Sequence, residues 1–204
     1  KEYEWGFKPK DIEIYTFKNV NNYGMSITTT INDTIPNNQP TLLIGAGSSR
    51  LGEMLYTKDF KPLIQTDFSE IVVNQKKKEC EHLYPEMIWE RADARESLTP
   101  LLKLIQKPNE DPIYFGSVID KGLIDALYLG NDNIDVEIPK IVSNVVEVLD
   151  PDWGVFVTFS RSHPDCLEKY LKNTELVSIE ARRLEYPDIY LYRLCRGAQS
   201  VAYY

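Results

Sequence analysis

Short apolar runs alternate with longer amphipathic segments from residue 41 onward, which is the pattern of an α/β protein. The apolar runs predict strands, and helix start and stop signals mark most of the segments between them. The predicted strands are Thr41–Ile44, Leu63–Thr66, Met87–Arg91, Tyr114–Asp120, Gly154–Phe159, Leu176–Leu184 and Ile189–Cys195. The predicted helices are Arg50–Tyr56, Ser69–Leu83, Thr99–Gln106, Leu123–Leu129, Ile138–Leu149 and a short helix after Pro164.

The order of these elements predicts the fold class. Strand and helix alternate five times, and two strands then follow around Tyr186-Pro187-Asp188 as a hairpin. We therefore expect a Rossmann-like, seven-stranded, mostly parallel sheet with helices on both faces and a C-terminal antiparallel hairpin. Residues 1–40 are aromatic and then polar, and we assign them to an N-terminal segment. Residues 41–204 form one domain in this interpretation.

Composition and charge narrow the classes of function. The chain has 204 residues and a formal net charge of −8, and such a surface repels phosphate backbones and anionic membranes. A basic partner or a small substrate fits better. Three separated cysteines without a CxxC pair, and only two histidines, predict neither disulfides nor a metal site. Reduced thiols and the lack of a secretory or membrane-spanning pattern favour the cytoplasm.

The strongest local signal is the glycine-rich stretch Gly45–Ser49, which lies between the first predicted strand and the first predicted helix. Glycines at this point permit a tight turn and a close approach of a ligand to the backbone. A dinucleotide fingerprint requires a small residue where Arg50 stands. A nucleoside without phosphates therefore suits this loop better than a nicotinamide dinucleotide.

Carboxylates follow the second and third predicted strands. Asp67 lies about 20 residues beyond Gly45, which is the spacing of an acid that binds ribose hydroxyls. It also precedes the helix at Ser69 and could cap it, and both roles are compatible. Asp93 could accept a hydrogen bond from an adenine amino group, or it could be a turn residue.

Two further stretches lie at the ends of later strands. Asp120 and Lys121 lie at the end of the fourth strand, at the edge where ligands bind in such sheets, but a simple surface ion pair explains them equally well from spacing alone. Residues Ser160–Pro164 follow the fifth strand and either border an acceptor site or, more simply, form a capped loop before a helix.

Several stretches resemble the seven-strand (class I) S-adenosylmethionine-dependent methyltransferases. The most specific is Val118–Leu127, which resembles the branch that methylates lysines or the N-terminus of translation elongation factor 1-alpha. The other similar stretches are Tyr3-Glu4-Trp5, Gly45–Ser49, Thr66–Ser69, Asp93-Ala94, Tyr190–Gly197 and Ser200–Ala202.

The resemblance implies a role for each matching residue. The implied cofactor-binding residues are Trp5, Gly45, Ala46, Gly47, Asp67, Phe68, Asp93, Ala94 and Lys121, and the implied catalytic residues are Asp120 and Lys121. Within this set, Asp67 would hold the ribose, Phe68 would lie against the adenine, and Trp5 would close over the cofactor from the N-terminal segment. Asp120 and Lys121 would line the methyl end, where Asp120 could orient an acceptor amine.

The function that the resemblance implies is methyl transfer from S-adenosyl-L-methionine, with S-adenosyl-L-homocysteine as the product. A protein lysine or N-terminus is the expected acceptor, without nucleic-acid or membrane partners. Two alternatives stay open, namely a small-molecule methyltransferase and a binding domain that has lost turnover. The second is motivated by Leu43 and Gly116, which stand where the family often has acids.

Overall fold

The computed structural model describes residues 35, 38–80, 82–111, 113–130, 133–173, 175–184 and 189–197. The strands are β1 (Thr41–Ile44), β2 (Leu63–Asp67), β3 (Met87–Arg91), β4 (Ser117–Lys121), β5 (Val155–Ser160), β6 (Leu176–Leu184) and β7 (Ile189–Arg196). The helices are α3 (Leu51–Tyr56), α4 (Glu70–Cys80), the 3-10 helix η1 (Thr99–Leu104), α5 (Leu123–Gly130), α6 (Ile134–Val148) and α7 (Pro164–Leu171).

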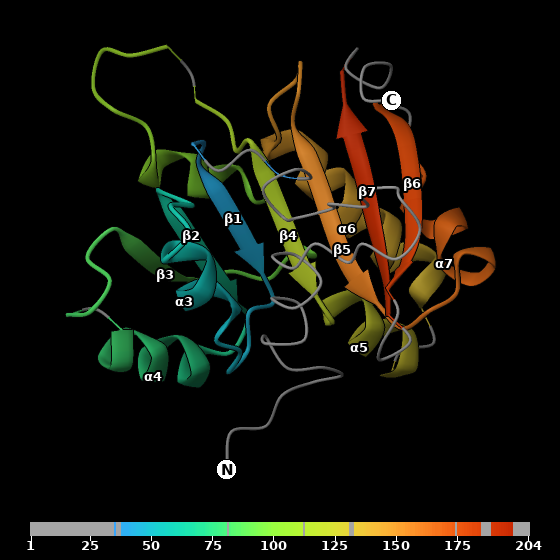
Figure 1. The fold of residues 1–204 in the computed structure, drawn as a ribbon, viewed down its shortest axis with the longest axis horizontal. Helices are drawn as coiled ribbons and strands as arrows, with labels where there is room; N and C mark the ends of the chain where they lie inside the picture. Colours follow the sequence, from blue (N-terminus) through green and yellow to red (C-terminus); the bar gives the residue numbers. More distant parts are fainter. Residues whose placement is uncertain are drawn as a thin grey trace, which may run out of the picture.

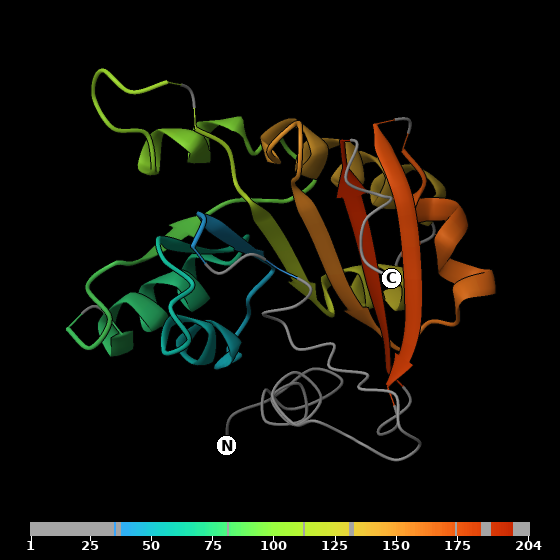
Figure 2. The ribbon, with the colours of Figure 1, turned by 45° about the horizontal axis from the view of Figure 1, so that its top comes forward.

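The strands form one seven-stranded sheet in the order β3-β2-β1-β4-β5-β7-β6 (Figure 1). Neighbouring strands from β3 to β5 pair in parallel, whereas β7 pairs antiparallel with both β5 and β6. Figure 2 shows the twist of this sheet from β3 at one edge to β6 at the other. The predicted fold class is confirmed, including the antiparallel β6–β7 pair, although the hairpin turn itself lies outside the described residues.

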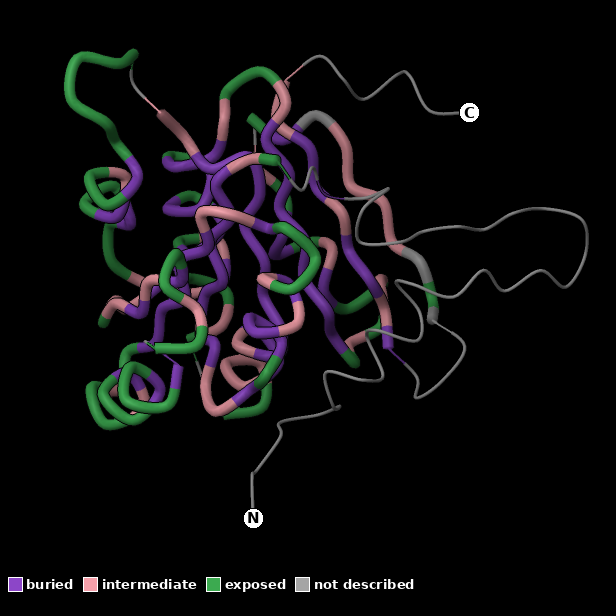
Figure 3. Tube along the Cα trace, turned by 60° about the vertical axis from the view of Figure 1, so that its left-hand side comes forward, coloured by how far each residue is buried: buried purple, intermediate pink, exposed green. Residues whose placement is uncertain are grey.

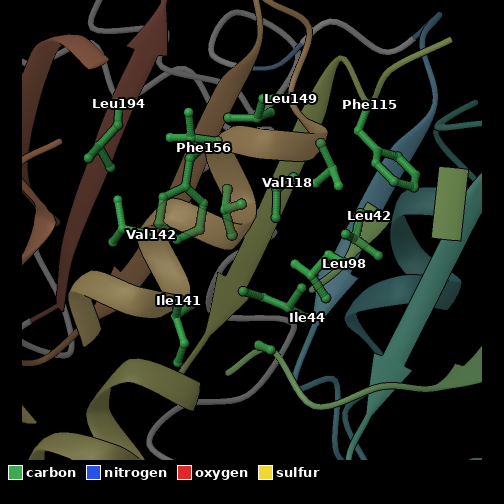
Figure 4. Packing of buried hydrophobic residues seen from close by; sticks show 14 of the residues in the cluster. Leu42, Ile44, Leu98, Phe115, Val118, Ile141, Val142, Leu149, Phe156 and Leu194 are labelled. Carbon is green, nitrogen blue, oxygen red and sulfur yellow. The ribbon is translucent and has the colours of Figure 1, made fainter. Parts of the chain in front are cut away.

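Two hydrophobic cores cover the two faces of the sheet, because successive strand residues point to opposite faces. On one face, Leu43 and Val157 pack with side chains of α3 and α4. On the other, Val118 and Phe156 pack with α6 residues such as Val142 (Figure 4). Figure 3 shows the buried positions concentrated in the strands and in the inner sides of the helices. The sheet is therefore a rigid support for the loops at its edges.

Two helices differ most from the sequence expectation, and α4 also ends at Cys80 instead of Leu83. Helix α6 begins at Ile134 instead of Ile138, because Ile134 packs against the core and gives the helix a further turn, which leaves Pro139 inside it. The segment after Thr99 is a 3-10 helix, in which residues three apart eclipse each other. Leu98 and Leu101 are buried at that spacing, and the Leu101 amide donates to the Leu98 carbonyl at 3.0 Å.

The strand order reverses its direction between β1 and β4. The loops that leave the carboxyl ends of these two strands diverge, and open α/β sheets bind ligands in the crevice formed there. Within the described residues, no helix has both the length and the apolar composition needed to cross a membrane.

Candidate functional site

The glycine loop after β1 is held in a conformation that side chains disfavour. Gly45 and Gly47 both have φ of +57°, in the left-handed region. The intervening Ala46 amide donates to the Thr66 carbonyl of β2 at 2.9 Å, which fixes the loop to the neighbouring strand. A Cβ built on Gly45 would lie 2.8 Å from the Cβ of Leu123, whereas one on Gly47 meets nothing within 4 Å. Gly45 therefore permits α5 to approach, and Gly47 faces open space.

Asp67, the last residue of β2, fixes the position of this loop. Its Oδ2 accepts a hydrogen bond from the Gly47 amide at 2.9 Å, and its Oδ1 accepts one from the Ser69 amide at 2.9 Å. The second bond holds the turn directly before α4, next to the helix start that the sequence suggested Asp67 could cap. Each carboxylate oxygen still has a lone pair for another donor. Asp67 also lines the cleft described next, so both proposed roles are compatible with its position.

Two adjoining cavities lie at the carboxyl ends of β1, β2 and β4. The first has a volume of about 250 Å³ and is lined by Gly45, Ala46, Gly47, Ser48, Ser49, Asp67, Phe68, Lys121, Gly122, Leu123 and Ala126. The second has a volume of about 220 Å³ and is lined by Gly45, Phe68, Ala92, Asp93, Ala94, Arg95, Leu123, Ala126, Leu127 and Ile141. Four lining residues are shared, so the two cavities form one cleft, which has the size of a small-molecule site.

The cleft brings together most of the residues that the sequence singled out. Phe68 borders both cavities and is 64% exposed. Asp93 and Ala94 line the second cavity, with Ala94 packed into the hydrophobic core. Trp5 and the rest of the Tyr3-Glu4-Trp5 stretch lie outside the described residues.

Asp120 occupies a different position from the one we expected at the methyl end. Its side chain is fully buried and caps α5, because it accepts hydrogen bonds from the amides of Leu123 at 2.8 Å and Ile124 at 3.3 Å. The Thr158 hydroxyl of β5 donates to the same carboxylate at 2.7 Å. The described walls of the cleft contain Lys121 but not Asp120. The structure thus supports a positioning role for Asp120 instead of contact with a ligand.

Burial changes the acidity of this carboxyl group. Desolvation, assisted by the nearby charge of Asp125, raises the pKa of Asp120 to about 7, although the hydrogen bonds from Thr158 and the α5 amides act in the opposite direction. Asp120 therefore changes its charge near neutral pH while it holds the start of a helix that lines the cleft.

Asp125 is a functional candidate that the sequence interpretation missed. It lies in the first turn of α5, where it accepts hydrogen bonds from the Ser160 hydroxyl and from the Arg161 amide, the latter at 2.9 Å. The Tyr192 hydroxyl donates to the Ser162 carbonyl at 2.5 Å. These bonds fix the loop after β5 against the start of α5 on one side and against β7 on the other. The only sequence signal was an acid in the first turn of a predicted helix, which is common in helices that have no ligand.

Arg95 is a second residue that the sequence interpretation missed. Its guanidinium forms two short hydrogen bonds to Asp93, from Nε to Oδ1 at 3.0 Å and from Nη2 to Oδ2 at 2.7 Å. These interactions lower the pKa of the Asp93 carboxyl group. The described residues contain no cluster of side chains suited to a metal ion.

Comparison with known proteins gives the site a context. No family model matches the chain. The eEF1A lysine and N-terminal methyltransferase of Xenopus laevis is 28% identical over 132 residues, which are 64% of this chain and 17% of that protein. The mouse protein of the same name is 27% identical over 133 residues, again 17% of its length. The chain thus spans less than a fifth of the length of these curated relatives.

Solved structures with the same fold cover much more of the chain. A methyltransferase from Pyrococcus furiosus superimposes with a TM-score of 0.64, over 97% of this chain and 88% of that one, at 11% identity. An S-adenosylmethionine-dependent methyltransferase from Clostridium acetobutylicum gives a TM-score of 0.60, over 82% and 89%, at 14% identity.

The chain thus has the fold of solved S-adenosylmethionine-dependent methyltransferases. Its sequence is similar to that of the eEF1A lysine and N-terminal methyltransferases over about two thirds of its length.

Proposed function

We propose that this chain binds S-adenosyl-L-methionine in the cleft and transfers its methyl group to a lysine or N-terminal amine of a protein. The observation that carries the proposal is the carboxylate of Asp67, which holds Gly47 of the glycine loop and borders the same cleft as Phe68. The acceptor class follows from the names of the curated relatives, and the net charge of −8 favours a basic partner.

The residues of the cleft fit this cofactor. Each oxygen of Asp67 has accepting capacity left, which suits the two hydroxyls of a ribose. The second cavity is lined mainly by apolar side chains, with Asp93 as an acceptor for an amino group, which suits adenine. The open space beside Gly47 leaves room for a ligand to approach the backbone.

The bound cofactor supplies an activated methyl group on a sulfonium, so the protein mainly has to align the acceptor and exclude water. An acceptor lysine has an ordinary pKa of about 10.4 and must lose its proton first. Lys121 lines the cleft and is only 7% exposed. Its positive charge would disfavour the charged form of an acceptor amine nearby. Asp125 would hold the loop after β5 at the acceptor side.

Two measurements test the proposal. Calorimetry with S-adenosyl-L-methionine and S-adenosyl-L-homocysteine should show binding with a stoichiometry of about one. Incubation with methyl-labelled cofactor and a cell lysate should then place label in protein, as methyl-lysine or a methylated N-terminus after hydrolysis. Label in small molecules would favour a different acceptor, binding without transfer would favour a non-catalytic domain, and no binding would overturn the proposal.

The free cysteines Cys80, Cys166 and Cys195 support a cytoplasmic protein in this proposal.

Gly45 and Gly47 provide a matched pair of variants. Both glycine-to-alanine substitutions place a side chain at φ of +57°, which costs about 1–2 kcal/mol. Gly45→Ala adds an overlap with Leu123, so we expect it to lower the stability further, whereas Gly47→Ala places its methyl in the open cleft. Thermal unfolding should rank Gly45→Ala as the less stable variant. Gly47→Ala should show a loss of cofactor affinity that exceeds its loss of stability, and equal unfolding temperatures would contradict the assigned contacts.

A further inference from the structure

The second cavity, which we call the base end of the cleft, contains an ion pair between Asp93 and Arg95. The geometry of this pair fixes the direction of the carboxylate in addition to neutralising its charge. The Arg95 guanidinium faces the Asp93 carboxylate through two nitrogens, and the Arg95 backbone amide also donates to Oδ1 at 2.9 Å. Such two-nitrogen pairs fix the plane and direction of a carboxylate as well as its charge. Because both residues line the second cavity, this fixed carboxylate is part of the cavity wall.

Helix α6 anchors this ion pair from behind. Nη1 of Arg95 lies 3.7 Å from Oε2 of Glu137, which places the guanidinium between two carboxylates. The amide of Asn144, a buried residue, donates to the Ala94 carbonyl at 2.9 Å. Glu137, Ile141 and Asn144 recur at the spacing of one helix face, and Ile141 itself lines the cavity. Helix α6 thus holds the Asp93–Arg95 segment at two points, the Ala94 carbonyl and the Arg95 side chain.

Oδ2 is the less occupied of the two oxygens of Asp93. Oδ1 accepts from the backbone amide at 2.9 Å and from Nε of Arg95 at 3.0 Å. Oδ2 accepts one short bond from Nη2 and shares the single Nε hydrogen with Oδ1 at the longer distance of 3.2 Å. The hydrogen bonds from Arg95 also lower the pKa of Asp93, so the carboxylate is ionised at neutral pH and accepts only. A ligand atom that meets Oδ2 must therefore be a donor.

We propose that Arg95 is a positioning residue that makes the cleft selective for a 6-aminopurine over a 6-oxopurine, by holding the Asp93 carboxylate aimed at the base. This inference rests on the proposed cofactor. An amino group donates to Oδ2, whereas a carbonyl in the same place is an acceptor and leaves two acceptors facing each other. A site built around such a hydrogen bond rejects the mismatched analogue more strongly than one that depends on apolar fit.

The test compares the affinities of S-adenosyl-L-homocysteine and its deaminated 6-oxo analogue, S-inosyl-L-homocysteine, by calorimetry. The unmodified chain should prefer the amino form at least about tenfold. Arg95→Met should lower that preference about tenfold, because Asp93 loses its fixed direction, while Arg95→Lys keeps the charge without the two-nitrogen geometry and should fall between. The preference is a ratio of affinities, so a general loss of stability does not imitate this result.

Glu96→Gln is the matched control, since Glu96 lies in the same loop and lines a neighbouring cavity but not the base end of the cleft. Its preference should equal that of the unmodified chain. The inference is overturned if the unmodified chain binds both compounds equally, or if Arg95→Met keeps the full preference. If the unmodified chain binds neither compound, the proposed function itself fails, and the two failures are therefore distinguishable.

Discussion

Replacing Asp67 with alanine is expected to weaken the binding of S-adenosyl-L-homocysteine by about 100-fold or more. A hydrogen bond to a charged group contributes about 1.5–3 kcal/mol, and in the proposed site two ribose hydroxyls lose their acceptor. The variant also frees the amides of Gly47 and Ser69, so the glycine loop loses the side chain that fixes it to β2. Both effects act on the same cleft, which is why we expect this single substitution to have the largest effect on affinity.

Calorimetry of Asp67→Ala measures this loss directly. Asp67→Asn should also bind poorly, because its amide nitrogen must face one of two backbone donors. Glu79→Ala, an exposed acid near the end of α4, is the control and should bind like the unmodified chain. Thermal unfolding of each variant separates a lost ligand contact from a lost fold. Unchanged affinity in a folded Asp67→Ala variant would remove Asp67 from the proposed ribose site.

The fold could be predicted from the sequence because the strands that define it are buried on both faces and appear as short apolar runs. Residues Thr41–Ile44 show this most clearly, since all four are buried. The ends of helices and strands were harder to predict from the sequence. The start of α6 at Ile134 depends on packing against residues far away in the chain, and the local signal of Asn133 before it competes with the Pro139 signal for a later start. The 3-10 geometry of η1 likewise depends on which leucines reach the core.

The site was predictable to the extent that it follows from strand ends. The position of Asp67 and Asp93 in the wall of the cleft could be predicted, because a carboxylate just after a buried strand reaches the shared edge of a parallel sheet. Sequence position does not reveal where a side chain points, so Asp120 was assigned to the cleft although its carboxylate turns into the start of α5. Arg95 was missed because its role depends on an ion pair that spacing alone does not show.

The second large effect that we expect is a dependence of the free energy of unfolding on pH, caused by the buried carboxyl group of Asp120. Its pKa in the folded state is about 7, above the ordinary value near 3.8. The folded state therefore binds this proton more tightly than the unfolded state, and the resulting stabilisation is fully present below about pH 4. It is lost as the pH rises through 7. One pKa unit corresponds to about 1.4 kcal/mol, so the change amounts to a few kcal/mol, on the order of 4 at most.

Asp120→Asn removes this titration and keeps the size of the side chain. The amide oxygen can still accept from Leu123, and the Thr158 hydroxyl can rotate to accept from the amide nitrogen, but Ile124 loses its bond. The lost bond contributes a penalty that does not depend on pH. We therefore expect the variant to be less stable than the unmodified chain at pH 5 and to gain relative stability, by a few kcal/mol, as the pH approaches 8.

Urea unfolding at pH 5, 6.5 and 8 measures this difference, provided that the slope of each transition stays the same. Asp59→Asn is a suitable control, because the Asp59 side chain is 79% exposed and asparagine tolerates its φ of 65°. Its stability should follow that of the unmodified chain across the same range. Parallel curves for Asp120→Asn and the unmodified chain would mean that Asp120 titrates at an ordinary pKa. In that case its carboxylate would be charged at neutral pH, and the cap of α5 would not respond to pH near 7.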